Sequence, residues 1–195
     1  MIPENTNPMK NIILIGMPGA GKSTTGVILA KALRRQFIDT DLLIQERAGR
    51  LLQDIIDSDG PDAFKTLEEE TILSLNGQSA VIATGGSVVF SGRAMQHLKS
   101  KGVVVYLKIS FDEMVKRLRN ITTRGIVLSR GETLREMYDE RIPLYERYAD
   151  MTVECSDEDF ETVVGNVIRE MNTRVAGGRA LHNQDAGDRH GRYAA

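Results

Sequence analysis

Short runs of consecutive apolar residues alternate along the chain with longer segments in which apolar residues recur every three or four positions. Five runs have the length of buried strands: residues 10–16, 36–38, 81–84, 103–107 and 151–154. Eight segments have helical spacing: residues 22–35, 42–48, 51–58, 62–75, 91–100, 111–119, 133–147 and 157–172. Strands that alternate with helices in this way predict an α/β fold, a five-stranded parallel sheet flanked by helices.

The same pattern predicts one compact domain over residues 10–173. Residues 1–9 are expected to be a flexible leader. From residue 174 to 195 the chain offers few large apolar groups to bury, which predicts a disordered tail. Two segments inside the domain are expected to form small insertions: residues 42–76, and residues 120–131, where no strong period is present and a mobile lid is predicted.

Composition and charge exclude several classes of protein. A net charge of -2 and a pI near 6.0 give no electrostatic basis for binding nucleic acid or an anionic membrane surface. No apolar run approaches the roughly 20 residues that span a bilayer, and the first residues lack the order of a signal peptide. Cys155 is the single cysteine, so an internal disulfide is excluded and a cytoplasmic location is expected.

The segment between the first strand and the first helix carries the strongest chemical signal. It matches G-x-x-x-x-G-K-[ST], the phosphate-binding loop of nucleotide-binding proteins, in the strand-to-helix context that this motif requires. Its backbone N–H groups and the helix N-terminus favour phosphate, the lysine reaches the terminal phosphates, and the serine hydroxyl binds Mg²⁺. These residues predict a site for ATP and Mg²⁺: Gly16, Met17, Pro18, Gly19, Ala20, Gly21, Lys22, Ser23 and Thr24.

Acidic residues follow the second predicted strand, in Asp39-Thr40-Asp41. The carboxyl ends of parallel strands lie beside the phosphate loop, where open α/β sheets bind ligands. Asp39 and Asp41 can also be explained as N-cap residues of the next helix, since aspartate favours that position. A residue can cap the helix and still take part in chemistry, so both explanations stay open.

Three further motifs give a more specific resemblance. They are Asp39-Thr40-Asp41, Thr84-Gly85-Gly86 after the third strand, and Arg141-Ile142-Pro143-Leu144-Tyr145 on a late helix. With the phosphate loop, they resemble the shikimate kinase family, a branch of the nucleoside monophosphate kinase-like fold, over residues 10–172. The resemblance implies a P-loop kinase that transfers a phosphoryl group from ATP to a small acceptor in amino-acid biosynthesis.

The resemblance also implies roles for single residues. Asp39 would join Ser23 in holding the Mg²⁺ shell, and Asp41 would orient or deprotonate the acceptor hydroxyl. Arg124 would close over the phosphates from the lid, and Arg117 would stack on adenine. The neighbouring Arg119 is an alternative for the adenine contact. The catalytic set is then Lys22, Asp41 and Arg124.

On the acceptor side, the resemblance implies that Gly85 and Gly86 offer backbone N–H groups and that Arg141 grips a carboxylate. Arg141 can also be explained as half of a surface ion pair with Glu140 or Glu146. The residues expected to bind the acceptor are Asp41, Lys65, Gly85, Gly86, Ser87 and Arg141.

Three departures from the family pattern fall on the acceptor pocket or the lid. Lys65 stands where the family has a second arginine for the acceptor carboxylate, and a lysine lacks the planar, two-pronged donation of arginine. Ser87 replaces a glycine and adds a hydroxyl that could bind an extra polar group. The lid contains Arg124-Gly125-Ile126-Val127, whereas the family has Arg-Pro-Leu-Leu.

These departures favour a smaller acceptor than shikimate, namely a hydroxy amino acid such as homoserine, with shikimate as the alternative. The sequence gives less support to two other classes of protein. A nucleotide-binding regulatory module without chemistry is disfavoured because the donor, metal and acceptor residues are all present. A nucleic-acid-associated nucleotidase is disfavoured by the acidic charge balance. A monomer is expected from the family.

Overall fold

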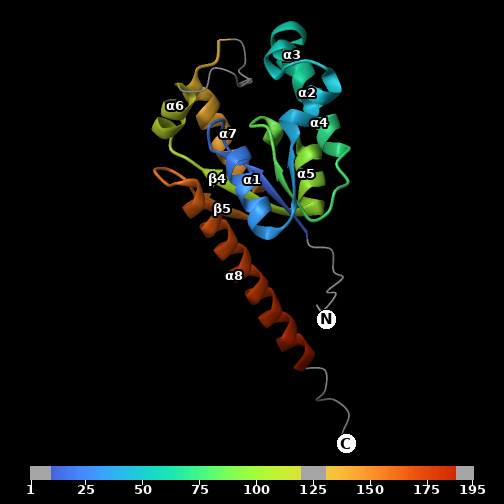
Figure 1. The fold of residues 1–195 in the computed structure, drawn as a ribbon, viewed down its shortest axis with the longest axis vertical. Helices are drawn as coiled ribbons and strands as arrows, with labels where there is room; N and C mark the ends of the chain where they lie inside the picture. Colours follow the sequence, from blue (N-terminus) through green and yellow to red (C-terminus); the bar gives the residue numbers. More distant parts are fainter. Residues whose placement is uncertain (1–9, 120–130, 188–195) are drawn as a thin grey trace, which may run out of the picture.

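The computed structural model describes residues 10–119 and 131–187 of the 195-residue chain (Figure 1). Five parallel strands form one sheet in the order β2-β3-β1-β4-β5. Their bounds are β1 Asn11–Ile15, β2 Gln36–Asp39, β3 Ala80–Ala83, β4 Gly102–Lys108 and β5 Met151–Glu154. The predicted five-stranded parallel sheet is confirmed, and the strand order is information that the sequence pattern did not contain.

Each predicted helix is present to within a few residues, apart from the longer C-terminal one. The bounds are α1 Lys22–Leu33, α2 Thr40–Ala48, α3 Leu52–Asp59, α4 Pro61–Leu73, α5 Gly92–Lys101, α6 Phe111–Arg119, α7 Leu134–Tyr148 and α8 Phe160–Gly187. A short 3₁₀ helix, η1 (Val88–Phe90), was not predicted. Because it follows the glycine-containing turn after β3, it lies next to the predicted acceptor residues.

The main hydrophobic core lies between the sheet and two layers of helices. Strands β1 and β3 are entirely buried. Helices α1 and α8 pack together on one face of the sheet, and α4, α5 and α7 gather with η1 on the other (Figure 1). These two layers explain the continuous apolar runs of the strands, because a strand covered on both faces has no solvent-exposed side.

The order of the strands determines where the candidate site lies. Strand β1 is central and pairs with β3 on one side, through Ile13 and Ile82, and with β4 on the other, through Ile13 and Val104. Strand β2 pairs with β3. All strands are parallel, so the segments that follow β1, β2 and β3 leave the same edge of the sheet, side by side.

A second, smaller hydrophobic cluster lies outside the main core. It consists of Ile44, Leu52, Ile55 and Phe64, with partly buried residues around it. These side chains come from α2, α3 and α4, which stand together at one end of the molecule (Figure 1). These three helices therefore share a small core of their own. They overlap residues 42–76, for which an acceptor-binding insertion stays a prediction.

The predicted disordered tail needs a correction. Helix α8 does not end near residue 172 but continues to Gly187 and runs away from the rest of the domain (Figure 1). The scarcity of large apolar groups argued against packing, but backbone hydrogen bonds within a helix are local and need no tertiary partner. Alanine, arginine, leucine and glutamine in this stretch are good helix formers.

Three predictions fall on residues outside the described ranges. They concern the leader at 1–9, the lid at 120–130 with Arg124, and the last eight residues. Among the residues that the structure describes, no helix has the length and apolar character needed to cross a membrane.

Candidate active site

The phosphate loop leaves β1 and enters α1 in a backbone shape that depends on glycine. Gly16 has φ 145°, and a Cβ there would lie 2.5 Å from the carbonyl oxygen of Leu107. Gly21 precedes α1 with φ 85°, in the left-handed region. The loop therefore aims the N-terminus of a twelve-residue helix at the site, where backbone N–H groups and the helix dipole favour a phosphate.

Lys22 is the first residue of α1 and is 5% exposed. Its ammonium group donates hydrogen bonds to the carbonyl oxygens of Gly16, at 2.7 Å, and Met17, at 2.9 Å. The positive charge is thus held over the loop itself, within reach of any phosphate that the loop binds.

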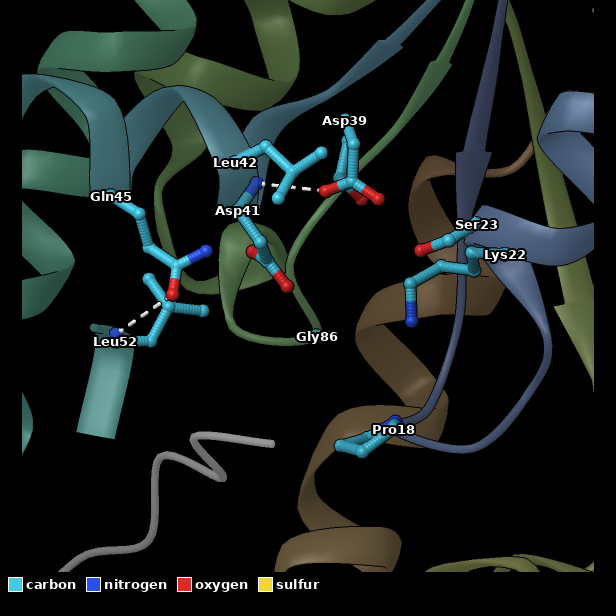
Figure 2. A pocket seen from close by; sticks show the side chains of 10 residues that line it. Pro18, Lys22, Ser23, Asp39, Asp41, Leu42, Gln45, Leu52 and Gly86 are labelled. Carbon is cyan, nitrogen blue, oxygen red and sulfur yellow. Dashed lines mark hydrogen bonds between the residues drawn. The ribbon is translucent and has the colours of Figure 1, made fainter. Parts of the chain in front are cut away.

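A cavity of about 240 Å³ lies between this loop and the start of α2 (Figure 2). It is lined by the predicted residues Pro18, Lys22, Ser23, Asp39, Asp41 and Gly86. Four lining residues were not predicted: Leu42, Gln45, Leu52 and Thr84. The cavity therefore brings together residues from the ends of β1, β2 and β3, as the parallel order requires. Thr24, by contrast, is exposed and does not line it.

Of the two acidic residues, Asp39 caps the helix and Asp41 lies in its first turn, and both line the cavity. Asp39 is the N-cap of α2, and its Oδ1 accepts a hydrogen bond of 3.0 Å from the backbone N–H of Asp41. In Figure 2 the Asp39 carboxylate points across the cavity toward Ser23, and the Asp41 carboxylate points toward Gly86. The capping geometry fixes where the two carboxylates stand in the cavity.

The oxygen ligands in this cavity suit Mg²⁺ bound together with phosphate and water, rather than a metal ion coordinated by side chains alone. No group of three His, Cys, Asp or Glu side chains that could hold a metal exists in the described part of the chain. The hydroxyl of Ser23 and the carboxylate of Asp39 line one cavity beside the phosphate loop. Mg²⁺ is bound in such sites by one or two protein oxygens together with phosphate oxygens and water.

The turn after β3 forms the other wall. Gly85 donates its backbone N–H to the hydroxyl of Thr40, at 3.2 Å, in the buried interior. The expectation that Gly85 offers this group to an acceptor therefore does not match the structure, because Thr40 already uses it. The carbonyl of Gly86 accepts a hydrogen bond of 2.6 Å from the hydroxyl of Tyr145. Burial raises the pKa of Tyr145, so that hydroxyl stays protonated and donates.

Arg141 lies one helical turn before Tyr145 on the same face of α7. It is 2% exposed, so the surface ion pair considered from the sequence is excluded. Its guanidinium lies 5.3 Å from the ring centroid of Phe90 and beside Gly86, where a Cβ would come to 3.2 Å from Nη1. Arg141 and Asp41 line one small pocket, of about 20 Å³, together with the turn after β3.

Lys65 is not brought into the cavities that Asp41 lines. It lines a neighbouring hollow of about 210 Å³ with Glu68, Ser87 and Phe90, and its ammonium group lies 5.3 Å from the centroid of the Phe90 ring that Arg141 also faces. Its ammonium group is 3.6 Å from the carboxylate of Asp62, which is almost fully exposed. Ser87 does reach the small pocket, but its hydroxyl donates to Glu68 at 2.7 Å.

Glu68 is the buried ionisable residue that sequence reasoning missed. It is 2% exposed, and burial is the largest cause that raises its pKa to about 7. A signal was available, since Glu68 lies four residues after Phe64 and four before Ile72, both buried. A carboxylate on the apolar face of a helix carries a large desolvation cost and deserves a functional explanation.

Arg117 lies beside the phosphate loop, on the side of the site where ATP is expected. Its guanidinium donates to the carbonyl oxygens of Gly19, at 3.3 Å, and Cys155, at 3.0 Å, while Nε pairs with Glu113. It therefore ties the phosphate loop to the segment after β5, and its contact with adenine stays a prediction. Arg119 is exposed and lines a different hollow, on α6.

The geometry and the fold define a P-loop kinase of the nucleoside monophosphate kinase-like type. Residues 18–172 match the family model described as shikimate kinase. A shikimate kinase of Vibrio cholerae is 34% identical over 169 residues, which cover 85% of this chain and 97% of that protein. One of Legionella pneumophila is 37% identical over 164 residues, with 83% and 94% covered.

Solved structures similar to this one include members of the same family. Shikimate kinase from Acinetobacter baumannii in complex with shikimate has a TM-score of 0.79 and 28% identity, and the match covers 85% of this chain and 94% of that one. The chain belongs to the shikimate kinase family. It is therefore an ATP-dependent phosphotransferase that uses Mg²⁺ and acts on a small molecule, and the class predicted from the sequence is confirmed.

Proposed function

We propose that this protein is a shikimate kinase, which transfers the γ-phosphoryl group of ATP to a hydroxyl of shikimate in the cytoplasm. The observation that carries the proposal is that the buried Arg141 and the half-buried Asp41 meet beside the turn after β3, in a small pocket that shares Pro18, Asp41, Leu52 and Gly86 with the larger cavity at the phosphate loop. The guanidinium of Arg141 can bind a carboxylate of the acceptor, and the carboxylate of Asp41 can accept a hydrogen bond from its hydroxyl. The family membership supports shikimate as the molecule that bears both groups.

The case for homoserine loses its two supports. It required the hydroxyl of Ser87 to be available to a ligand, but that hydroxyl is bonded to Glu68. It also required Lys65 to replace an arginine at the acceptor carboxylate, but Lys65 lies in a neighbouring hollow that neither Asp41 nor Arg141 lines. The comparisons likewise favour shikimate, the alternative from the sequence, over homoserine.

The chemistry follows from where the side chains stand. Asp41 accepts the proton of the acceptor hydroxyl as its oxygen bonds to the γ-phosphorus, and the bond from that phosphorus to the bridging oxygen of ADP breaks. Lys22 and the N-terminus of α1 stabilise the negative charge on the transferring and leaving oxygens. Ser23 and Asp39 would hold Mg²⁺, which supplies charge neutralisation at the β- and γ-phosphates when bound.

The deciding experiment measures kcat/KM for shikimate and for homoserine with purified protein and Mg·ATP. We expect a value in the ordinary enzyme range of about 10⁴ M⁻¹s⁻¹ or above for shikimate, and a value at least about 100-fold lower for homoserine. The Asp41→Asn variant, purified identically, controls for a contaminating kinase. Phosphorylation of homoserine at the higher rate would reverse the assignment.

A further inference from the structure

The hydroxyl of Tyr145 is bonded to the turn that forms one wall of the site. Tyr145 lies on α7 with its side chain fully buried, and its hydroxyl donates to the carbonyl oxygen of Gly86 at 2.6 Å. The two residues are 59 positions apart in the sequence. The bond therefore joins α7, which carries Arg141, to the turn after β3.

Gly86 stands where the acceptor pocket meets the phosphate loop. A Cβ on Gly86 would lie 3.1 Å from Cδ of Pro18 and 3.2 Å from Nη1 of Arg141. Gly86 also lines both the cavity at the phosphate loop and the small pocket that Asp41 and Arg141 line. A displacement of this turn would therefore change the shape of both.

The same bond sets the orientation of a peptide group. Because the peptide bond is planar and trans, the N–H of Ser87 points opposite to the carbonyl of Gly86 and so away from Tyr145. Ser87 itself lines the small pocket. By holding the carbonyl against α7, the Tyr145 hydroxyl also fixes the direction in which the turn presents its next backbone donor.

Packing alone does not account for a hydroxyl at this position. The rings of Tyr145 and of Tyr106 on β4 are stacked, with centroids 5.1 Å apart and an interplanar angle of 20°. The Tyr106 hydroxyl is also buried, and it has no hydrogen-bond partner among the described residues. Ring stacking needs no hydroxyl, so the hydroxyl of Tyr145 is explained by the carbonyl that it holds.

We propose that Tyr145 is a positioning residue of the phosphoryl-transfer site, whose hydroxyl holds the turn at residues 85–87 in the position that binds the acceptor. It acts through Gly86 and touches neither ATP nor the acceptor. Arg141 binds the acceptor carboxylate, and Tyr145, one turn later on α7, fixes the wall beside it. Without the bond, the turn moves and the acceptor is held less tightly. This rests on the proposed function, which places the acceptor in this pocket.

The test removes one hydroxyl at a time from three buried tyrosines. Tyr145→Phe keeps the ring and its stack but loses the bond to Gly86. We expect it to raise the KM for shikimate by about ten-fold, with kcat lowered by less than about three-fold and the KM for ATP within about two-fold. ATP hydrolysis without an acceptor should also stay within about two-fold, because Lys22 and the phosphate loop are unchanged.

Two matched variants separate positioning from folding. Tyr138→Phe removes a hydroxyl that donates at 2.8 Å to the carbonyl oxygen of Ile109, a residue that lines neither cavity. It should lower the melting temperature about as much as Tyr145→Phe does, and leave the KM for shikimate within about two-fold. Tyr106→Phe removes the hydroxyl without a partner among the described residues, so it should neither raise this KM nor lower the melting temperature.

A KM for shikimate within about two-fold of the wild type in Tyr145→Phe would overturn the proposal. So would the same rise in Tyr138→Phe, or an equal rise in the KM for ATP in Tyr145→Phe. The proposed function fails separately, on the wild type alone. If the wild type phosphorylates homoserine and not shikimate, the three variants are compared on homoserine, where a rise in KM confined to Tyr145→Phe is expected.

Discussion

The phosphate loop and the acceptor pocket meet at Lys22 and Asp41, but they are built in different ways. The phosphate side comes from contiguous residues at the end of one strand and the start of one helix. Most of its groups are backbone N–H donors, whose directions are set by the positive φ angles of the loop glycines. Its chemistry is therefore almost complete within residues 16–23.

The acceptor pocket is assembled from distant segments. Asp41 comes from α2, Ser87 from the turn after β3 and Arg141 from α7, and Glu68 on α4 holds Ser87. Its groups are mostly side chains, and two of them, Ser87 and Glu68, are buried and bonded to each other. A change in one partner can therefore alter the others, which is expected of buried polar networks.

Because of this difference, substitutions in the phosphate loop should all impair the same step, whereas substitutions in the acceptor pocket should have several different effects. Loss of a phosphate contact removes charge stabilisation for every acceptor. Loss of an acceptor contact changes which molecule is used, or how tightly it is held, while ATP binding is preserved.

The largest effect is expected at the phosphate loop. Lys22→Ala should lower kcat by two or more orders of magnitude with the fold intact, because its ammonium group stands where charge develops in phosphoryl transfer. The measurement is kcat at saturating ATP and shikimate, with thermal unfolding as the check on folding. Retention of more than about a tenth of wild-type kcat, a change of only ~1.4 kcal/mol in the barrier, would contradict the assignment.

The next effect separates the two aspartates that line the cavity. Asp41→Asn should reduce kcat by at least about 100-fold and leave the KM for ATP within a few-fold, because Asp41 handles the acceptor hydroxyl. Asp39→Asn should instead raise the Mg²⁺ concentration needed for half-maximal rate. Mg²⁺ titration of both variants is the comparison, and superimposable curves would remove the distinction between a metal residue and an acceptor residue.

The same difference between a local phosphate loop and an acceptor pocket built from distant segments explains how well each was predicted from the sequence. The phosphate loop is local, so its motif and its strand-to-helix context were sufficient to find it. Lys65 and Ser87 were predicted to bind the acceptor, but the directions of their side chains depend on packing between α4 and η1. Ser87 is bonded to Glu68, and no spacing rule gives a partner nineteen residues away.

A smaller effect is expected on stability. The pKa of Glu68 is raised from 4.5 to about 7, by burial first and by Asp41, against the opposing influence of Ser87, Arg141 and Lys22. The folded state therefore holds this proton more tightly than the unfolded chain. Ionisation of Glu68 as pH rises from about 4.5 to 7 should lower the free energy of unfolding, by up to about 3 kcal/mol.

Glu68→Gln stays neutral and should lose this part of the pH dependence. The measurement is the melting temperature of wild type and variant at pH 5 and pH 7.5. The wild type should lose several degrees more than the variant between the two values, and Glu69→Gln should behave like the wild type. Parallel curves for wild type and Glu68→Gln would mean that Glu68 is already ionised in the folded protein at pH 5.

The smallest effect is expected at Lys65, where the sequence placed an acceptor contact. Its ammonium group lies in a neighbouring hollow that Asp41 and Arg141 do not line, 3.6 Å from the exposed Asp62 and 5.3 Å from the Phe90 ring centroid, and contacts of this kind at an exposed site contribute little. Lys65→Ala should therefore change kcat/KM for shikimate by less than about three-fold. Arg141→Lys, which keeps the charge but loses two-pronged donation, should lower it by more than about ten-fold. A ten-fold loss in Lys65→Ala would instead mean that Lys65 moves to the acceptor carboxylate on binding. The acceptor pocket, unlike the phosphate loop, would then be completed by its ligand.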